Sequence, residues 1–581
     1  MSQYTKNLRS FVPLTKEEMH ARGWEQLDVL FLYGDAYIDH PSFGVPLLAR
    51  LLMENGYRVG IVAQPRFRNE NEALEDIRVF GTPKLFVGIG SGVVDSMLNN
   101  YTANKKKRSD DAYSPGGWAG KRPDRAVEVY ARLARKAFPI TPIVCGGVEA
   151  SLRRLAHYDY WENRINRSIL LTSDVDLLIF GMGERQVLKL AQELSKPEGG
   201  IHNLKNERGI AYVINKSEVL EIQNRLVLPS FEEVRDDKKK FARTSLLVES
   251  EANPYNSRSI VQPHGSKAVV VNSPCLPCSS AELDSVYNLK FTKLPHYSYT
   301  EEIPAYKMIR FSVAAHRGCF GGCSFCAISL HQGKIIQSRS EESILSEVKG
   351  LKSIPGFTGI VSDIGGPTAN GYKIGCRSRN LLEKCKKASC LFPVVCSNLI
   401  TDHSPQTLLL RKAASLPGIK KVFIASGVRY DLALHDKEYL KQLITHHVGG
   451  HLKVAPEHIH PDVLRLMRKP SFDLFCRFEN EFRSISEKCG KEQYLVPYFI
   501  SSFPGTDEQK MGLLEQWVKR RGWKLQQVQA FIPTPMTLAS VMYWSGFDPI
   551  EKRYLYVAKS FKERKSQQKM LQPHHTKSRR R

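Results

Sequence analysis

The sequence "KMIRFSVAAHRGCFGGCSFCAI" (residues 307–328) joins a short apolar run to a loop that holds three cysteines. The apolar half is typical of a buried strand, and Cys319, Cys323 and Cys326 follow it with C-x3-C-x2-C spacing. The next cysteine, Cys376, lies fifty residues beyond the third. A strand that leads directly into clustered cysteines predicts an α/β fold with its chemistry at the carboxyl ends of the strands. The loop therefore offers three thiolates and lacks a fourth.

A set of three cysteines matches an iron–sulfur cluster with one iron left open. Thiolates hold such clusters, and an open coordination position is what a catalytic metal needs. We therefore expect the substrate or a cofactor to supply the missing ligand. Gly318, Gly321 and Gly322 allow the backbone to wrap closely around a cluster. Two alternatives remain: a structural zinc completed by His316 or His331, and buried thiols that bind no metal.

Strands alternate with helices on both sides of the loop. Short β-branched runs followed by glycine turns predict a doubly wound α/β domain over residues 1–230. The rhythm returns over residues 301–530, where six or so βα units favour a full or partial (β/α) barrel. Between these domains, residues 231–300 are polar and weakly patterned, so we expect a linker that wraps them. Residues 531–581 form a C-terminal extension with a basic tail. Within the barrel, the strands after the cysteine loop are predicted at 357–366, 392–398, 419–427, 450–458, 494–505 and 525–533.

Composition restricts the class of protein. The chain has 581 residues, 42% of them hydrophobic and 25% charged, as in ordinary globular proteins, and should form about two to four domains. No apolar run is long enough to span a membrane, and the N-terminus lacks the apolar core of a secretory signal. We expect a cytoplasmic protein with reduced cysteines rather than disulfides.

The charge balance suggests a candidate partner. The net charge is +25, and residues 559–581 hold nine Lys or Arg and one Glu. Such a tail can bind RNA through phosphate contacts, so RNA is a candidate partner. The alternative is a solvated tail with no specific partner.

With Phe325 placed before Cys326, the cysteine loop resembles that of the radical S-adenosylmethionine superfamily. The resemblance implies a [4Fe–4S] cluster whose open iron binds the amino and carboxylate groups of S-adenosylmethionine. One electron from a reducing protein of the flavodoxin or ferredoxin type then cleaves the sulfonium and releases a 5′-deoxyadenosyl radical. Longer stretches narrow the resemblance to the YgiQ family, a group without an assigned substrate. They include "GDAYIDHPSFG" (34–44), "GGVEASLRRLAHYDYW" (146–161) and "THHVGGHLKVAPEH" (445–458).

The same resemblance implies further cofactor contacts at later strand ends. Gly365 and Gly366 match the glycine pair that meets the methionine amino group. Pro367 stands where the family often has Glu, which leaves that contact to backbone carbonyls. Ser426 is expected to hydrogen-bond the cofactor, and Arg429 to pair with its carboxylate bidentately. The alternatives are a tight turn for the glycines and a surface ion pair for the arginine.

A further strand end, "KVAPEH" (453–458), is expected at the mouth of the barrel, where Lys453, Glu457 and His458 line it. Lys453 is the cofactor-binding candidate of this group.

A second cysteine group follows the glycine pair with C-x8-C-x4-C-x5-C spacing. Four thiolates within 21 residues can close a zinc site or hold an auxiliary cluster. The alternative is a set of ordinary half-buried cysteines. A separate pair, Cys275 and Cys278, lies in the expected linker and is interpreted as incidental. The group consists of Cys376, Cys385, Cys390 and Cys396.

Two features mark the N-terminal domain. Asp39 and His40 follow its first strand and are similar to the cobalamin-binding loop, although the spacing to Gly44 departs from that pattern. We expect a cobalamin-binding-like fold, with a capped helix start as the alternative. Dense charges after the strand at 142–146 either contact a substrate that faces the barrel or form an ion-paired contact between the domains. These are Glu149, Arg153, Arg154, His157 and Asp159.

The leading hypothesis is an enzyme that abstracts hydrogen from a substrate held between the domains. Methylthiolation of RNA is one candidate outcome, but only Cys145 precedes residue 275, so the cysteines that hold a cluster in the N-terminal domain of methylthiotransferases are absent. The rival hypothesis is a non-catalytic iron–sulfur protein that binds RNA or transfers electrons.

Overall fold

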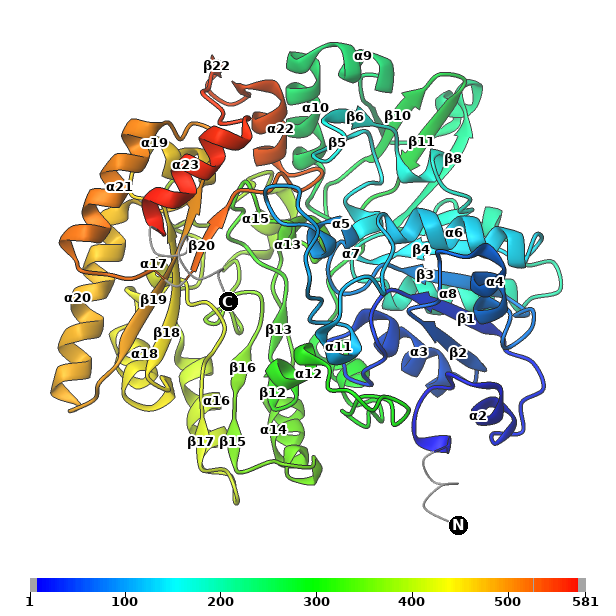
Figure 1. Ribbon diagram of the computed structural model, residues 1–581, viewed down its shortest axis with the longest axis horizontal. Coiled ribbons are helices and arrows are strands. Elements are labelled where there is room, and N and C mark those ends of the chain that lie inside the picture. Colours follow the sequence, from blue (N-terminus) through cyan, green and yellow to red (C-terminus); the bar gives the residue numbers. More distant parts are fainter. Residues whose placement is uncertain (1–7, 526, 573–581) are drawn as a thin grey trace, which may run out of the picture.

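The computed structural model describes residues 8–525 and 527–572. An N-terminal α/β domain (blue to teal in Figure 1) lies beside a barrel (green through orange). None of the helices in these ranges is long and apolar enough to cross a membrane. The last nine residues of the basic tail, 573–581, on which part of the RNA expectation rests, lie outside the described residues.

The N-terminal domain is built on a sheet in which nine strands of the described chain pair in the order β2-β1-β3-β4-β7-β8-β11-β10-β9. The first five strands of that order are parallel, as in other doubly wound α/β domains. The remaining four add a mostly antiparallel edge. The strands are β1 (Val29–Tyr33), β2 (Val59–Ala63), β3 (Phe86–Gly90), β4 (Ile143–Gly146), β7 (Leu177–Ile179), β8 (Ile210–Asn215), β9 (Arg225–Val227), β10 (Ser259–His264) and β11 (Lys267–Val271).

Helices cover both faces of this sheet, because successive side chains of a strand point to opposite faces. Phe31 of β1 packs in the core that holds α3 and α8, whereas Leu30 and Leu32 pack in the core that holds α4 and α6. The expected doubly wound fold is confirmed. The helices of this half are α2 (Lys16–His20), α3 (Gly44–Glu54), α4 (Glu70–Ile77), α5 (Ser96–Asn100), α6 (Ala126–Ala137), α7 (Gly147–Ser151) and α8 (Glu184–Leu194), and a hairpin of β5 (His157–Asp159) and β6 (Arg164–Asn166) follows α7.

Residues 231–300, expected to be a linker, instead contribute strands to the sheet. β10 and β11 form an antiparallel pair, and β11 also pairs with β8, which joins them to the sheet of residues 1–230. Val269 and Val270 are fully buried on its two faces. The polar stretch before these strands forms two surface helices. The weak hydrophobic periodicity of its sequence is therefore that of helices that bury only one face. These are α9 (Phe231–Asp236) and α10 (Lys238–Ser250), with α11 (Ser280–Tyr287) after the strands.

The second half is a partial barrel of parallel strands that follow one another in chain order. β12 pairs with β16, β15 with β17, β18 with β19 and β19 with β20, while a single bridge between Val428 and Val454 links β17's segment to β18. Within the described chain, the last strand does not pair with the first, so the barrel stays open. The strands are β12 (Ser312–Ala314), β15 (Ile360–Val361), β16 (Asp363–Gly365), β17 (Lys421–Val422), β18 (His451–Glu457), β19 (Tyr494–Ser501) and β20 (Gln527–Ala530).

Helices enclose the barrel, and one predicted strand is absent. Residues 392–398 form bends and turns instead of a strand. The stretch is apolar because Leu391, Val395 and Cys396 pack around Phe320 of the cysteine loop. The remaining helices of this half are α12 (Pro304–Ile309), α13 (Ile328–His331), α14 (Glu341–Gly350), α15 (Arg379–Lys384), α16 (Ser404–Ala414), α17 (Tyr430–Ala433), α18 (Lys437–Gln442), α19 (Pro461–Met467), α20 (Phe472–Lys488) and α21 (Glu508–Arg520).

The C-terminal extension ties the two halves together. It contains α22 (Leu538–Ser545), a hairpin of β21 (Phe547–Asp548) and β22 (Arg553–Tyr554), and α23 (Phe561–Leu571), and α22 lies beside α10 at the top of Figure 1. Trp544 stacks on Tyr158 of the N-terminal domain, with ring centroids 5.1 Å apart. Arg564 is buried and donates a hydrogen bond of 3.2 Å to the carbonyl of Ala103.

If residues 231–300 belong to the sheet, Ile260→Ala should lower the free energy of unfolding by about 2–5 kcal/mol, because it leaves a cavity in the core. The matched control is Val227→Ala on the neighbouring β9, where the side chain is 46% exposed and the expected change is within about 0.5 kcal/mol. Denaturant unfolding measures both. Equal, small effects would contradict the assignment of β10 to the sheet.

Candidate functional site

The cysteine loop begins where β12 ends, at the inner edge of the barrel. β13 (His316–Arg317) pairs with β14 (Gln337–Ser338), and the loop between them carries Cys319, Cys323 and Cys326. Two glycines make its path possible. Gly318 has φ +83°, and a Cβ there would lie 2.3 Å from the carbonyl oxygen of Ile335; Gly322 has φ +61°, and its Cβ would lie 2.4 Å from that of Ala388. The loop is therefore wrapped on both sides by backbone.

The three cysteines have the chemistry and placement that an iron–sulfur cluster requires. A Cβ added to Gly321 would lie 3.4 Å from Sγ of Cys319 and 3.9 Å from Sγ of Cys323, so this glycine leaves open the space between them. Burial raises the pKa of Cys319, and that of Cys326 to about 12, so thiolates form here only beside positive charge such as iron. No three Cys, His, Asp or Glu side chains of the described chain converge on one metal ion. In an iron–sulfur cluster each of the three thiolates would hold a different iron.

Other segments of the chain hold the loop between Cys323 and Cys326. The backbone N–H of Ser324 donates to the carbonyl of Met467 at 3.1 Å, and its hydroxyl donates to that of Leu466 at 2.6 Å. The carbonyl of Ser324 in turn accepts from the N–H of Ala539 in α22, at 2.9 Å. Phe325 packs edge-on against Phe503, with ring centroids 6.2 Å apart. The aromatic residue of the motif is thus a packing anchor of the loop.

Arg429 lies directly against the loop, but its bidentate face is already used. Its Nε and Nη2 donate to the two carboxylate oxygens of Asp431 at 3.0 and 2.5 Å. Its Nη1 points to Sγ of Cys323 at 3.7 Å. Asp431 occupies this bidentate face in the structure, and the pairing of Arg429 with a cofactor carboxylate stays a prediction. Although burial alone would raise it, the guanidinium holds the pKa of Asp431 below its usual range.

A second buried cation near the cysteines was not anticipated from the sequence. Lys469 is 5% exposed, lies 3.9 Å from the carboxylate of Glu457, and lies close enough to Cys319 to favour its thiolate. Burial nevertheless raises the pKa of Glu457. In the sequence, Lys469 falls after a short helix rather than at a strand end, so the strand-end rule did not find it. Glu457 was expected at this mouth and lies there; His458 is fully buried, and burial lowers its pKa to about 3.

The glycine pair meets side chains of the barrel. A Cβ on Gly365 would lie 2.9 Å from Oγ of Ser426, and one on Gly366 would lie 2.6 Å from the ring of His316. Both positions therefore require glycine for close packing. The Ser426 hydroxyl donates a short hydrogen bond to Asp363, and the backbone N–H groups of residues 425 and 426 donate to the same carboxylate at 2.9 and 3.2 Å.

Lys453 and Pro367 occupy different surroundings. Lys453 is exposed on β18, and its charge acts on Asp363, whose pKa burial raises. Pro367 lines a cavity between the two domains. Of the cofactor-binding candidates, the structure therefore gathers Gly365, Ser426 and Lys453 around Asp363.

The second cysteine group lies next to the first. The N–H of Cys390 donates to the carbonyl of Phe320 at 3.0 Å, and Ser389 donates to the carbonyl of Gly321 at 2.7 Å. The pKa of Cys390 is raised to about 11, mainly by burial and in smaller part by the nearby Cys385, Cys396 and Cys376. The four cysteines are thus brought together, but no three of them converge on a metal ion in the described chain, so the second metal site stays a prediction.

A cavity of about 390 Å³ separates the two domains near the cysteine loop. The carboxyl ends of β1, β3 and β4 line one side of it through Tyr33, Gly90 and Gly146. His316, Gly366 and Pro367 of the barrel line the other side. This is the space at strand ends in which ligands of α/β proteins bind.

The Asp39–His40 pair is used internally. Asp39 is fully buried and forms an ion pair with Arg50. His40 is also buried, its Nδ1 accepts the N–H of Ser42 at 3.1 Å, and burial lowers its pKa to about 3. Among the described residues that line the interdomain cavity, neither member of the pair appears. The pair therefore stabilises the start of the first crossover.

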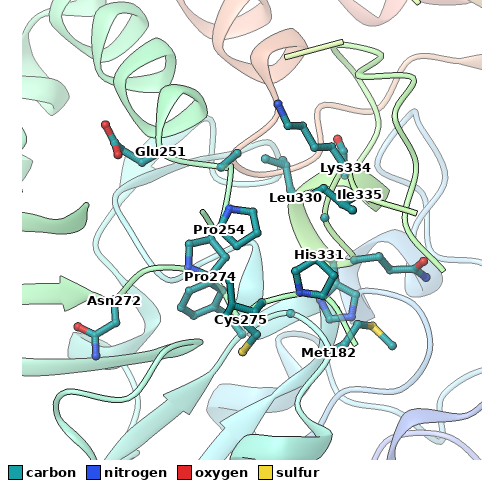
Figure 2. A pocket seen from close by; sticks show the side chains of 18 of the residues that line it. Met182, Glu251, Pro254, Asn272, Pro274, Cys275, Leu330, His331, Lys334 and Ile335 are labelled. Atoms are coloured by element: carbon teal, nitrogen blue, oxygen red, sulfur yellow. The ribbon is translucent and has the colours of Figure 1, made fainter. Parts of the chain in front are cut away.

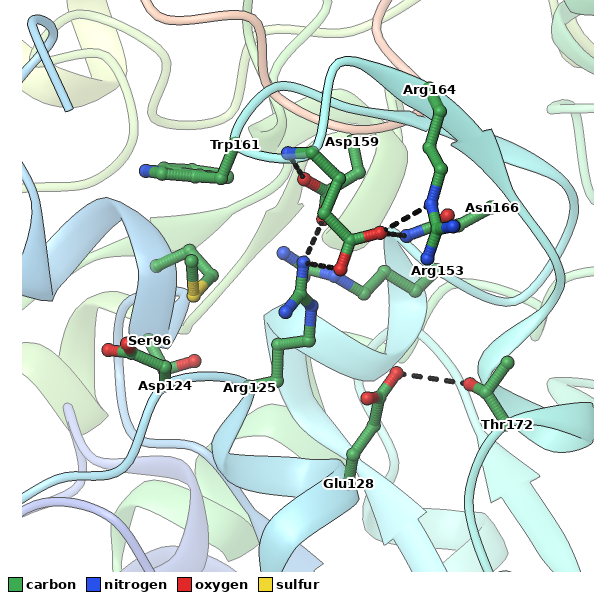
Figure 3. A network of polar contacts seen from close by, with 12 residues as sticks. Ser96, Asp124, Arg125, Glu128, Arg153, Asp159, Trp161, Arg164, Asn166 and Thr172 are labelled. Atoms are coloured by element: carbon green, nitrogen blue, oxygen red, sulfur yellow. Dashed lines mark hydrogen bonds and ion pairs between the residues drawn. The ribbon is translucent and has the colours of Figure 1, made fainter.

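The charges after β4 are mostly paired within the N-terminal domain. Asp159 accepts from Arg125 at 3.0 Å, and Arg125 also pairs with Glu162 at 2.6 Å (Figure 3). Arg153 forms a short ion pair with Asp95. Their neighbour Glu149 accepts the N–H groups of Ser96 and Val127, at 2.8 and 3.1 Å, and the ring of His157 lies 3.0 Å from the carbonyl of Leu155. These charges form ion pairs, but the pairs lie within the N-terminal domain and do not make the expected interdomain contact. The exception is Arg154, which has no acidic partner in the described chain.

A doubly wound domain followed by a parallel barrel with a three-cysteine loop defines the class of radical S-adenosylmethionine proteins. Comparisons with known proteins agree. Family models match residues 11–312 (Radical SAM N-terminal), 313–485 (Radical SAM superfamily) and 526–578 (Domain of unknown function, DUF3362). The chain belongs to the UPF0313 family, whose members include a protein called YgiQ.

Relatives in the family match over nearly the whole chain. The UPF0313 protein of Methanocella arvoryzae is 45% identical over 96% of this chain and 92% of its own length. UPF0313 protein YgiQ of Escherichia coli K12 is 41% identical over 97% of this chain and 84% of its own. Among solved structures, the radical S-adenosylmethionine methyltransferase TsrM of Kitasatospora setae, with cobalamin and a [4Fe-4S] cluster bound, is 12% identical, with a TM-score of 0.48 over 91% of this chain and 87% of its own.

Cys323→Ala should abolish retention of iron, because it removes one of the three thiolates that are expected to hold the cluster. Cys489→Ala is the matched control. Cys489 caps the C-terminal end of α20, where its thiol contacts the hydroxyl of Thr445, and its loss should leave the iron content unchanged. Iron and sulfide analysis of protein purified without oxygen measures both. Unchanged iron in the first variant would refute the assignment of the loop.

Asp431→Asn should destabilise the barrel by about 3–5 kcal/mol, because it leaves Arg429 buried without its carboxylate partner. Glu438→Gln removes the partner of Arg411 in an exposed pair and should cost no more than about 1 kcal/mol. Denaturant unfolding of the two variants provides the comparison. Equal costs would show that the Arg429 pair is not needed to hold the loop.

Proposed function

We propose that the protein is an enzyme that reductively cleaves S-adenosylmethionine and abstracts hydrogen from a substrate bound between its two domains. The observation that carries the proposal is the shared edge of the two domains. The cysteine loop follows β12, and the cavity of about 390 Å³ is lined by residues from that end of the barrel and from the strand ends of the N-terminal domain. A substrate in this cavity lies next to the cofactor site and is shielded on both sides.

Within this proposal, Cys319, Cys323 and Cys326 hold the cluster. When bound together, a reduced [4Fe–4S] cluster and S-adenosylmethionine supply one-electron cleavage of the sulfonium and the hydrogen-abstracting power that follows. The backbone of Gly365, Gly366 and Pro367 borders the cofactor. These positions lie at the carboxyl end of β16, next to β12.

The polar residues of the barrel would orient the cofactor and balance the charge of the thiolates. Ser426 and Lys453, both close to Asp363, form the polar end of the proposed cofactor site. Arg429 and Lys469 are buried cations beside the cysteines, and they offset the negative charge that thiolates bring into a site shielded from water. Phe325 keeps the loop packed against the barrel.

The electron and the substrate must come from elsewhere. We propose a reducing protein of the flavodoxin or ferredoxin type as the electron donor, since the chain needs a one-electron reductant. RNA remains a candidate substrate on the strength of the net charge of +25.

Anaerobic incubation with dithionite and S-adenosylmethionine tests the proposal. The wild-type protein should release 5′-deoxyadenosine, and Cys323→Ala should release none, while Cys489→Ala should match the wild type. Liquid chromatography of the nucleoside products measures the outcome. A cluster that is reduced by dithionite but yields no 5′-deoxyadenosine, even with cell extract added, would support the non-catalytic iron–sulfur protein instead.

A further inference from the structure

A second, smaller cavity of about 100 Å³ lies beside the interdomain cavity. Figure 2 shows Pro254 and Pro274 along one side of it, with His331 and Met182 on another. His331 ends α13, which starts two residues after Cys326, so this cavity adjoins the cysteine loop. Both halves of the chain contribute to its walls.

The cavity is lined by a buried arginine with no acidic partner. Arg154 is 7% exposed, and its hydrogen bond from Nη1 goes to the carbonyl of Ser151. Its Nε has no hydrogen-bond partner in the described chain, and no carboxylate forms an ion pair with it. Its guanidinium lies over the ring of Phe180, 4.8 Å from the centroid. A buried cation without a counter-charge is costly, so a site of this kind is completed by an anion.

All but one of the other arginine, lysine and carboxylate side chains that line the cavity are balanced by the protein itself. Arg185 pairs with Glu282 at 2.6 Å, and Arg258 pairs with Glu251 at 2.7 Å. The one remaining carboxylate, that of Glu184, forms a short ion pair with the Arg317 guanidinium. Lys334 donates to the carbonyl of Lys387 at 2.6 Å and adds a further positive charge at the edge. The uncompensated charge of the cavity is therefore positive.

Backbone geometry at the same cavity suits an oxyanion. β7 runs into a glycine turn, Gly181-Met182-Gly183, and α8 starts directly after it. Gly183 is the N-cap of α8 and provides no side-chain cap, so the first N–H groups of this 11-residue helix are open to an external acceptor. Residues 184–186 of that first turn line the cavity together with Arg154. A strand, a glycine turn and an uncapped helix start are the arrangement that binds phosphate in many α/β proteins.

We propose that this cavity binds the phosphate group of the substrate. The inference rests on the proposed function and names the class of molecule on which it acts. Gly181, Met182 and His331 line both the small and the large cavity, so a single molecule can place its phosphate on Arg154 and its body in the larger space. Arginine and backbone N–H groups together select phosphate, because they offer several donors in a fixed geometry.

Calorimetric titration of the cluster-containing, full-length protein with inorganic phosphate at constant ionic strength tests the proposal. The wild type should bind phosphate saturably and acetate much more weakly. Arg154→Met should weaken phosphate binding at least about tenfold, since it removes the charge-assisted donors. Arg258→Met is the matched control, because that arginine lines the same cavity outside the first turn of α8 and already pairs with Glu251, and its binding should match the wild type.

Further measurements separate a ligand role from a structural role. Arg154→Met should have the same iron content and thermal stability as the wild type, because methionine fills the space of the arginine side chain and removes a buried charge that has no partner. Phosphate binding that survives this substitution, or equal binding of acetate, would overturn the proposal. Glycerol 3-phosphate and dimethyl phosphate, which mimics an internal phosphate of RNA, then distinguish a small phosphorylated substrate from an RNA backbone. Release of 5′-deoxyadenosine by the same preparations tests the proposed function separately, since it does not require phosphate.

Discussion

The buried thiolates of the cysteine loop impose the main physical constraint on this end of the barrel, because their negative charge must be balanced. The three cysteines lie where burial raises the pKa values of Cys319 and Cys326, so their thiolates need positive charge close by. The iron of the proposed cluster would supply part of it. The protein supplies the rest through Arg429, whose Nη1 lies 3.7 Å from Sγ of Cys323, and through Lys469. Each cation in turn needs a carboxylate, which Asp431 and Glu457 provide. Charges of both signs therefore alternate through the site, and the loss of one leaves another unbalanced.

Distant segments close around the loop and hold it in place. Its glycines pass against the carbonyls of Ile335 and Ala388, its serine bonds the end of α19, and α22 of the C-terminal extension holds that serine from another side. The extension also packs on the N-terminal domain through Trp544. One element thus fixes both the loop and the relative position of the two domains, which in turn sets the shape of the interdomain cavity.

The two domains meet at the carboxyl ends of their parallel strands. Such edges collect backbone turns and helix starts that do not pair with their own sheet, and they become ligand sites. The N-terminal domain shows the contrast clearly. Arg153 faces into its own domain and pairs with Asp95, whereas Arg154, next in sequence, lines a cavity and has no acidic partner in the described chain. Two arginines adjacent in the sequence therefore have different roles: the first forms a structural ion pair, and the second is the one proposed to bind a ligand.

Sequence patterns alone were enough to predict the α/β fold class and the family, and to single out three cysteines as candidates to hold a cluster. Short apolar runs and glycine turns report local structure, and a cysteine spacing reports local chemistry, so both can be read without contacts. Pairing between distant segments cannot. The strands at 259–271 looked like part of a linker because their sheet partner, β8, is about fifty residues away, and the apolar stretch at 392–398 looked like a strand because its packing on Phe320 was invisible. Three features of the site could be seen only in the folded chain: the ion pair of Arg429 with Asp431, the position of Lys469 near the cysteines, and the lack of an acidic partner for Arg154 in the described chain. The reason is that charge balance in a buried site depends on which side chains meet in space.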